Sequence, residues 1–393
     1  MISTLANYLG KVIKCKSEER RESMKNLSSH LIRSEEIILT LRSLYESYGY
    51  NRCNVGTFEQ YDFYRRNRSS LCGEEVLVFT DADGRLMALK PDVTMSIVKN
   101  VKDAPGLRKV CYNENIYRIP TGGAGFRESV QTGLECIGNI DDYSTGEVLM
   151  LAIKSLKRIG DSGFILNLSH IDILDGLLDC AKIDKADREP ILKAVEQKNI
   201  PALKDLAKTL NVEKTYEDCL IKLITLYGTL KDTIDEVKSL AQGDRMIKAV
   251  SELEKIKDLM DAYGLGDRVY LDFSIRGGDD YYSGLIFRGF LEGVSAPVLS
   301  GGRYDKLIKR MGKSGGGIGF AVYLDTLNRK KQKEEEEETL LLYDDSVTPD
   351  QVIRRVSILK QDGIRVRAER EIPPECKYTR LLKMTKDGVS EID

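Results

Sequence analysis

Four polar residues have the types and spacing that a site for a small charged molecule requires. Asp92 and Thr94 stand two residues apart, and a carboxylate beside a neutral acceptor can hold an ammonium group. If FRESVQTGLECIG is a strand, its side chains alternate between two faces, and Gln131 and Glu135 share one polar face. We therefore expect a pocket for a small polar ligand. Asp92 or Thr94 as the cap of the following helix is the alternative, and both interpretations stay open on these residues alone.

Aromatic residues near the end of the same region supply the apolar part of such a pocket. Tyr281, Tyr282 and Tyr304 could wall a space for a flat ring. His170 stands alone between a predicted strand and a predicted helix, where a packed or capping histidine is the favoured interpretation over a catalyst. The chain has two histidines and eight scattered cysteines without a C-x-x-C pair, so we expect neither a metal site nor a cofactor, and we interpret the cysteines as reduced and mostly buried.

The glycine-rich stretch 298–328, VLSGGRYDKLIKRMGKSGGGIGFAVYLDTLN, organises the C-terminal part of this region. We expect a strand that breaks at Gly301-Gly302, then a short amphipathic helix containing Leu307, Ile308 and Met311. A second break at 315–317 leads into an apolar run that we expect to become a helix. Glycine pairs permit either a tight turn or a close backbone approach.

The elements that position these residues follow from hydrophobic periodicity. An apolar repeat of 3.6 residues predicts helices, and an alternation predicts strands. We expect a helix at 34–48, a hairpin with strands 76–80 and 86–90, two long strands within 108–138, a helix at 141–160, a strand and helix within 164–183, a helical insertion at about 184–264, two strands within 268–293, a charged linker, and a strand–helix–strand unit with one final strand at 381–384.

Composition bounds the class of protein. The 393 residues suggest two or three folded units, and 41% hydrophobic with 31% charged residues is typical of an ordinary globular protein. A formal net charge of -2 makes nucleic acid an unlikely partner. Without a long apolar run or a signal-peptide pattern, we expect no membrane association and a cytoplasmic location.

Three ordered segments resemble the signature motifs of class II aminoacyl-tRNA synthetases in their histidyl form. They are GYNRCNVGTFE, the segment 108–138, and the GGRYD stretch with its glycine turn; DYYSG (280–284) resembles the histidine-specific element. The resemblance implies an α+β fold with an antiparallel sheet flanked by helices. It also implies a synthetase-like domain over 1–335 that contains the helical insertion, and a small C-terminal α/β unit over 339–393.

The resemblance also implies roles for individual residues. Asp92 and Thr94 fall where the family holds the amino group of histidine, and Arg118 falls where an arginine bridges the substrate carboxylate and the α-phosphate. Gln131 and Glu135 also match family positions.

Two arginines of the catalytic family are not at their positions. Thr326 stands where the arginine that holds the nucleotide phosphates is expected, and Gly277 stands at the position of the activating arginine, with Arg276 one residue out of register. A one-residue shift turns a strand side chain to the opposite face, unless a bulge restores it. Each such charge-stabilising group accounts for about 10²–10³-fold in rate, so we expect no useful aminoacylation.

This combination resembles the regulatory-subunit family of ATP phosphoribosyltransferase, a group of histidyl-synthetase paralogues. That resemblance implies a non-catalytic subunit that supports the short-form catalytic subunit, which joins ATP and phosphoribosyl pyrophosphate, and that confers feedback inhibition by histidine. It implies a homodimer within a hetero-octamer. The alternatives are a working histidyl-tRNA synthetase or a tRNA-binding synthetase-like protein.

Two locations for the effector histidine stay open. One is a vestigial amino-acid pocket; the other is the interface with the catalytic subunit. The vestigial pocket would consist of Asp92, Thr94, Arg118, Gln131, Glu135, Tyr281, Tyr282 and Tyr304.

Overall fold

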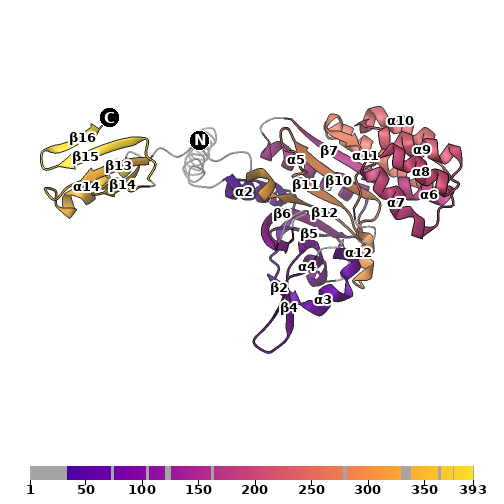
Figure 1. The fold of residues 1–393 in the computed structure, drawn as a ribbon, viewed down its shortest axis with the longest axis horizontal. Helices are drawn as coiled ribbons and strands as arrows, with labels where there is room; N and C mark the ends of the chain where they lie inside the picture. Colours follow the sequence, from indigo (N-terminus) through magenta and orange to yellow (C-terminus); the bar gives the residue numbers. More distant parts are fainter. Residues whose placement is uncertain are drawn as a thin grey trace, which may run out of the picture. The chain divides into compact units, whose positions relative to one another are not determined.

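A computed structural model describes most of the chain, in two compact units that meet in sequence after Asn328 (Figure 1). The described residues are 33–71, 75–102, 106–119, 125–160, 163–277, 281–328, 338–361, 364–374 and 376–392. The charge run 329–337, where we expect a linker, lies outside them. The domain assignment 1–335 and 339–393 stays a prediction.

The first unit is built on a nine-stranded sheet in the order β1-β5-β6-β12-β11-β10-β7-β9-β8. The six strands from β5 to β7 in this order are antiparallel, while β1 and β9 join by parallel pairing. The bounds are β1 Asn51–Arg52, β5 Arg108–Arg118, β6 Arg127–Gly138, β7 Phe164–His170, β8 Gly228–Thr229, β9 Val269–Leu271, β10 Leu285–Leu291, β11 Leu299–Arg303 and β12 Gly316–Tyr323. The predicted class II synthetase-like antiparallel sheet is confirmed.

The glycine-rich stretch differs from our expectation in two places. The chain does not break at Gly301-Gly302, because both glycines lie inside β11, paired with Phe320 and Gly319 of β12. A Cβ on Gly301 would lie 2.3 Å from the carbonyl oxygen of Gly319, so the pair serves close packing between strands. The apolar run after the second break was predicted as a helix and is mostly the strand β12; only the short α13, Leu324–Asn328, follows it.

One face of the sheet is covered by α2 (Arg33–Glu46) and α5 (Asp142–Ile159), which confirms both predicted helices. α2 buries Ile37, Leu41, Leu44 and Tyr45, at the spacing of one helical face. Burying such side chains contributes about 1.5–3 kcal/mol each. The Tyr45 hydroxyl also lies 2.9 Å from Ser155 Oγ of α5, which ties the two helices together.

The opposite face carries short helices and a small sheet. Together they form the second apolar core, which lies next to the cavity described below. The helices are α3 Tyr61–Arg66, α4 Val93–Asn100 and α12 Asp305–Arg310, with a 3-10 turn at Arg68–Leu71; the small sheet has the order β2-β4-β3, with β2 Phe58–Gln60, β3 Val78–Thr80 and β4 Leu86–Leu89.

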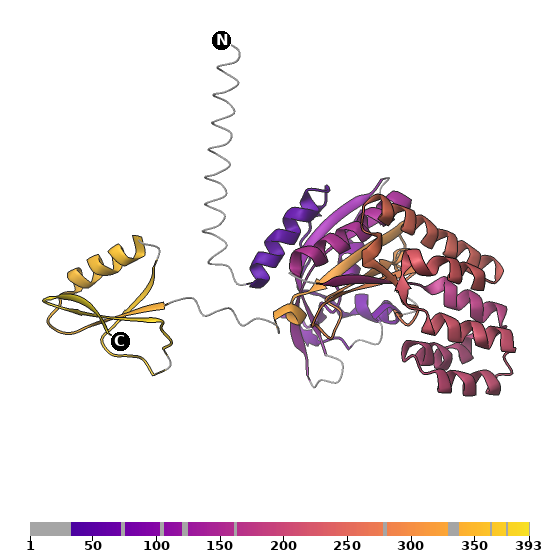
Figure 2. The same ribbon diagram turned by 90° about the horizontal axis from the view of Figure 1, so that it is seen from above.

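The predicted helical insertion is present beside the β7–β9–β8 end of the sheet, as a stack of helices (Figure 2). Its sequence is rich in Lys and Glu on exposed positions, while apolar residues at helical spacing face the neighbouring helices. The bounds are α7 Lys185–Glu196, α8 Ile200–Thr209, α9 Lys214–Thr225, α10 Leu230–Leu240 and α11 Gly243–Ala262, preceded by α6 Ile171–Cys180 and followed by a 3-10 turn at Gly266–Arg268.

The second unit is a four-stranded sheet in the order β14-β13-β15-β16 with one helix, α14. One final strand was predicted, and this was wrong, because β16 (Gly388–Ile392) pairs with β15 as a hairpin. The two-residue loop Lys386-Asp387, followed by Gly388 at φ 138°, is the turn signal that was overlooked. The other bounds are β13 Glu338–Tyr343, α14 Pro349–Gln361, β14 Arg365–Glu369 and β15 Arg380–Thr385.

Two chain-wide expectations concern cysteines and membranes. Among the described cysteines all six are free thiols, and three of them, Cys111, Cys136 and Cys219, are buried. In the parts of the chain that the structure covers, every helix is too short or too polar to span a bilayer.

Candidate functional site

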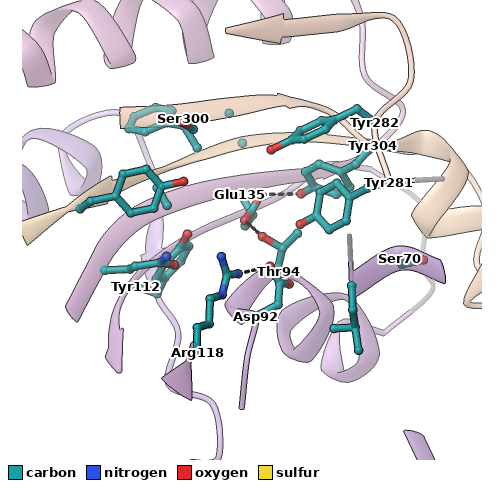
Figure 3. Close-up of a pocket in the computed structure, with 17 residues that line it drawn as sticks. Ser70, Asp92, Thr94, Tyr112, Arg118, Glu135, Tyr281, Tyr282, Ser300 and Tyr304 are labelled. Atoms are coloured by element: carbon teal, nitrogen blue, oxygen red, sulfur yellow. Dashed lines mark hydrogen bonds and ion pairs between the residues drawn. The ribbon is translucent and has the colours of Figure 1, made fainter. Parts of the chain in front are cut away.

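All eight residues predicted for the amino-acid pocket line one cavity on the sheet face opposite α2 and α5 (Figure 3). Its volume is about 120 Å³, well below the ~300–1,000 Å³ of sites for drug-sized ligands, so it suits a small ligand. The lining residues are Ser70, Leu71, Asp92, Thr94, Tyr112, Arg118, Gln131, Glu135, Tyr281, Tyr282, Ser300, Gly301, Tyr304, Gly319, Phe320, Ala321 and Tyr323.

Glu135 lines the cavity and is 1% exposed. The Thr94 hydroxyl donates to its Oε1 and the Tyr304 hydroxyl donates to its Oε2, both at 2.6 Å (Figure 3). Burial raises the pKa of Glu135 to about 8, against the two hydrogen bonds, and the nearby Asp92 carboxylate adds to the rise. The Glu135 carboxyl is therefore suited to share a proton with a basic ring nitrogen at neutral pH.

The structure confirms the capping role of Asp92, and its role toward a ligand stays a prediction. It is the N-cap of α4, because its Oδ1 accepts from the backbone N of Met95 at 2.7 Å. Its Oδ2 lies 3.4 Å from Nη2 of Arg118, which comes from the end of β5. Burial raises the pKa of the Asp92 carboxyl, and the Arg118 guanidinium opposes that rise. The cavity thus holds a carboxyl group and a guanidinium cation side by side.

Three tyrosines form one wall of the cavity. The ring centroids of Tyr281 and Tyr282 lie 4.8 Å apart and those of Tyr281 and Tyr304 lie 6.2 Å apart. Burial raises the pKa of Tyr304 and of Tyr281 well above its ordinary value, so both hydroxyls stay protonated and can donate. Gln131 is 5% exposed and adds an amide on the β6 side. A flat, polar ring matches this wall.

Further lining residues were missed by the sequence interpretation. Tyr112 precedes Arg118 by six residues on β5, so strand alternation places the two side chains on one face. That signal could have been used. Tyr323 and Ser300 come from β12 and β11, and Ser70 from a 3-10 turn. Their presence depends on strand pairing between distant segments, which leaves no local signal.

Glycine at 319 is required for this site. A Cβ there would lie 1.9 Å from Oε2 of Glu135 and 2.4 Å from the carbonyl oxygen of Leu134. We expect Gly319→Ala to lower the free energy of unfolding by about 1–3 kcal/mol, because the β12–β6 pairing and the carboxyl must both shift. Urea unfolding followed by circular dichroism measures this. Gly56→Ala is the matched control, since a Cβ there meets its nearest atom at 3.4 Å; equal losses for both variants would contradict the prediction.

The cations that a nucleotide triphosphate needs are not in this cavity. Of the lining residues, all of which belong to the described chain, Arg118 is the single cation. Thr326 lies on α13 and does not line the cavity, while its neighbour Asp325 accepts a hydrogen bond from Ser129 of β6. Arg276 points elsewhere: its Nη2 lies 3.2 Å from Oε2 of Glu189 on α7. Arg276 is not among the residues that line the cavity.

His170 has the capping role that was favoured for it. Its ring Nδ1 accepts from the backbone N of Asp172 at 3.3 Å at the start of α6. The other ring nitrogen lies 3.1 Å from Oε2 of Glu252 on α11. It is not part of the cavity lining.

Comparison with known proteins identifies the family. Residues 26–327 match the family model described as histidyl-tRNA synthetase. The ATP phosphoribosyltransferase regulatory subunit of Alkaliphilus metalliredigens is 31% identical to this chain over 72% of each sequence. The chain belongs to the family of ATP phosphoribosyltransferase regulatory subunits.

Solved structures agree with this family assignment. A Bacillus halodurans protein described as an ATP phosphoribosyltransferase regulatory subunit/histidyl-tRNA synthetase has a TM-score of 0.72 and 25% identity, covering 86% of this chain and 88% of its own. A chain of the Thermotoga maritima ATP phosphoribosyl transferase complex has a TM-score of 0.58 at 20% identity, covering 74% of this chain and 96% of its own, which shows a shared fold. In this regulatory-subunit family, the synthetase-like sheet is the common framework.

Proposed function

We propose that this chain is a non-catalytic regulatory subunit of ATP phosphoribosyltransferase and that its cavity binds the effector histidine. The observation that carries the proposal is the cavity itself, which pairs a small volume with a single cation. Family membership supports the regulatory role. We further propose that the chain forms a homodimer within a hetero-octamer with the short-form catalytic subunit, in the cytoplasm.

The charges of the cavity match those of an amino-acid zwitterion. The ammonium group of the ligand would bind at the Asp92 carboxylate, and the carboxylate of the ligand at the Arg118 guanidinium. Binding would therefore replace the ion pair between Asp92 and Arg118 with two ion pairs to the ligand. The imidazole ring would lie against the tyrosine wall with one nitrogen toward Glu135. Because Glu135 holds its proton up to about pH 8, it can share that proton with the imidazole.

The cation content of the cavity supports the proposal that the chain does not aminoacylate tRNA. Charging a tRNA requires stabilisation of the ATP phosphates during attack by the amino acid, and such groups each contribute about 10²–10³-fold. With Thr326 and Gly277 at the two arginine positions, we expect activation of histidine to fall by roughly 10⁴-fold or more.

Reconstitution tests the proposed function. The chain is co-expressed with a short-form ATP phosphoribosyltransferase catalytic chain, and the purified complex is assayed for phosphoribosyl-ATP formation. We expect the two chains to co-purify and the catalytic chain to gain at least about 10-fold in rate, on the order of 1.4 kcal/mol of activation free energy. A catalytic chain that neither binds this protein nor changes its rate contradicts the proposal, as does charging of tRNA with histidine at an enzyme-like rate.

A further inference from the structure

Among the described residues, two side-chain contacts connect the surroundings of the tyrosine wall to the helical insertion. One is the contact of Arg276 with Glu189 of α7, and the other is the contact of His170 with Glu252 of α11. Both contacts lie outside the cavity, and neither is needed for the ligand contacts proposed above. They flank the segment that carries Tyr281 and Tyr282.

The contact of Arg276 with Glu189 bears on the position of the Tyr282 ring. Arg276 is mostly buried, its side chain being 13% exposed, and its carbonyl oxygen accepts from Nη2 of Arg288 on β10 at 2.8 Å. The next residue, Gly277, packs flat on Tyr282, since a Cβ there would lie 2.3 Å from the ring. Leu192 of α7 lines the same small cavity as Arg276 and Gly277. A shift of α7 therefore moves the backbone on which Tyr282 rests.

The contact of His170 with Glu252 bears on the end of the segment that carries Tyr281 and Tyr282. Gly284, two residues after Tyr282, accepts through its carbonyl oxygen from the backbone N of Ile171 at 2.8 Å. A Cβ on Gly284 would lie 3.3 Å from Nε2 of His170, so this backbone rests against the histidine ring. Because Nδ1 of His170 accepts from a backbone N–H, its Nε2 carries the proton and donates to Glu252 at 3.1 Å.

We propose that Glu189 and Glu252 of the insertion are positioning residues for the tyrosine wall, so that ligand occupancy and packing of the insertion are coupled. The inference rests on the proposed function for the identity of the ligand, histidine. Coupling between two sites is reciprocal: if the insertion holds the wall in its binding geometry, a bound ligand must also stabilise the contacts of α7 and α11. The insertion is then the part of the chain that changes when the pocket fills.

The test measures histidine binding and hydrogen exchange on the full chain. Histidine affinity is measured by calorimetry, and exchange of the α7 and α11 amides is followed by mass spectrometry with and without saturating histidine. The variants are Glu189→Gln and Glu252→Gln. Lys238→Gln is the matched control, because Lys238 pairs with Glu254 at 2.7 Å between α10 and α11 and has no contact with the tyrosine segment among the described residues.

We expect histidine to slow exchange in both helices of the unsubstituted chain. In Glu189→Gln, histidine no longer slows exchange in α7, and histidine affinity falls about 5-fold or more. In Glu252→Gln, the same two changes occur, with the loss of slowed exchange in α11. Lys238→Gln behaves as the parent in both measurements. Histidine binding without any change in α7 or α11 overturns the inference and leaves the proposed function standing, as do variants with parental affinity. A parent chain that binds no histidine overturns both.

Discussion

Glu135→Ala is expected to weaken histidine binding by the isolated chain roughly 10- to 150-fold. It removes the hydrogen bond in which Glu135 shares its proton with the imidazole ring, and such a charge-assisted bond contributes about 1.5–3 kcal/mol. The Glu135 carboxyl is 1% exposed and is the group of β6 that we propose to face the ligand ring. Its removal also leaves the hydroxyls of Thr94 and Tyr304 without their acceptor. Isothermal titration calorimetry at neutral pH measures the change.

A control on the same strand separates this effect from a general weakening of β6. Glu128 lies near the start of β6, is exposed, and accepts from the Tyr117 hydroxyl at 3.0 Å. Glu128→Ala should bind histidine as the parent does. Thr94→Val gives a second view of the site, since it keeps the side-chain shape and removes one donor to Glu135. If Glu135→Ala keeps its fold by circular dichroism and binds histidine with parental affinity, the ligand does not use this cavity.

Glu135→Gln is expected to change how stability depends on pH. The folded-state pKa of Glu135 is about 8, raised from 4.5 by burial, so the folded chain holds a proton that the unfolded chain releases across this range. The contribution of protonated Glu135 to the free energy of unfolding is therefore fully present below about pH 4.5, and it is lost as pH rises toward about 8. Glutamine cannot ionise, so the variant should not show this loss.

The size of this effect is bounded by the shift itself. A change from 4.5 to about 8 corresponds to at most roughly 5 kcal/mol, at about 1.4 kcal/mol per pH unit. Urea unfolding of both proteins between pH 5 and pH 8.5 should show the stability of the variant gaining on that of the parent as pH rises. Asp92 and the tyrosines that face Glu135 are unchanged in both proteins. Parallel pH profiles for the parent and the variant would mean that Glu135 is ionised in the folded protein throughout.

Part of the site followed from local pattern alone. A strand alternates its side chains, so Gln131 and Glu135 were correctly placed on one face of β6, and the lone His170 was correctly interpreted as a cap. Asp92 shows the limit of such reasoning, because cap and ligand roles were treated as competing. Its two carboxylate oxygens have different partners, one Met95 and the other Arg118, so the capping role does not exclude a role toward a ligand.

The missed strand β16 had a local turn signal, whereas the two errors in the glycine-rich stretch depend on partners far away in sequence. Gly301 reads locally as a turn residue, but β10 and β12 pack against it through Phe287 and Phe320. The run IGFAVY is short, and periodicity cannot separate a buried helix from a central strand at that length. Pairing with β6 and β11 decides for the strand. The displacement of Arg276 from the family's arginine position was predicted, and its contact with Glu189 of α7, 87 residues earlier, had no local signal.

The most direct test of the central claim is the histidine dependence of phosphoribosyl-ATP formation by the reconstituted complex. Two complexes are compared, one with the parent chain and one with Glu135→Ala, each with the same catalytic chain. If the cavity is the effector site, histidine inhibits the first complex and inhibits the second only at concentrations roughly 10- to 150-fold higher. Equal inhibition of both complexes would contradict this account and would place the effector at the interface between the subunits.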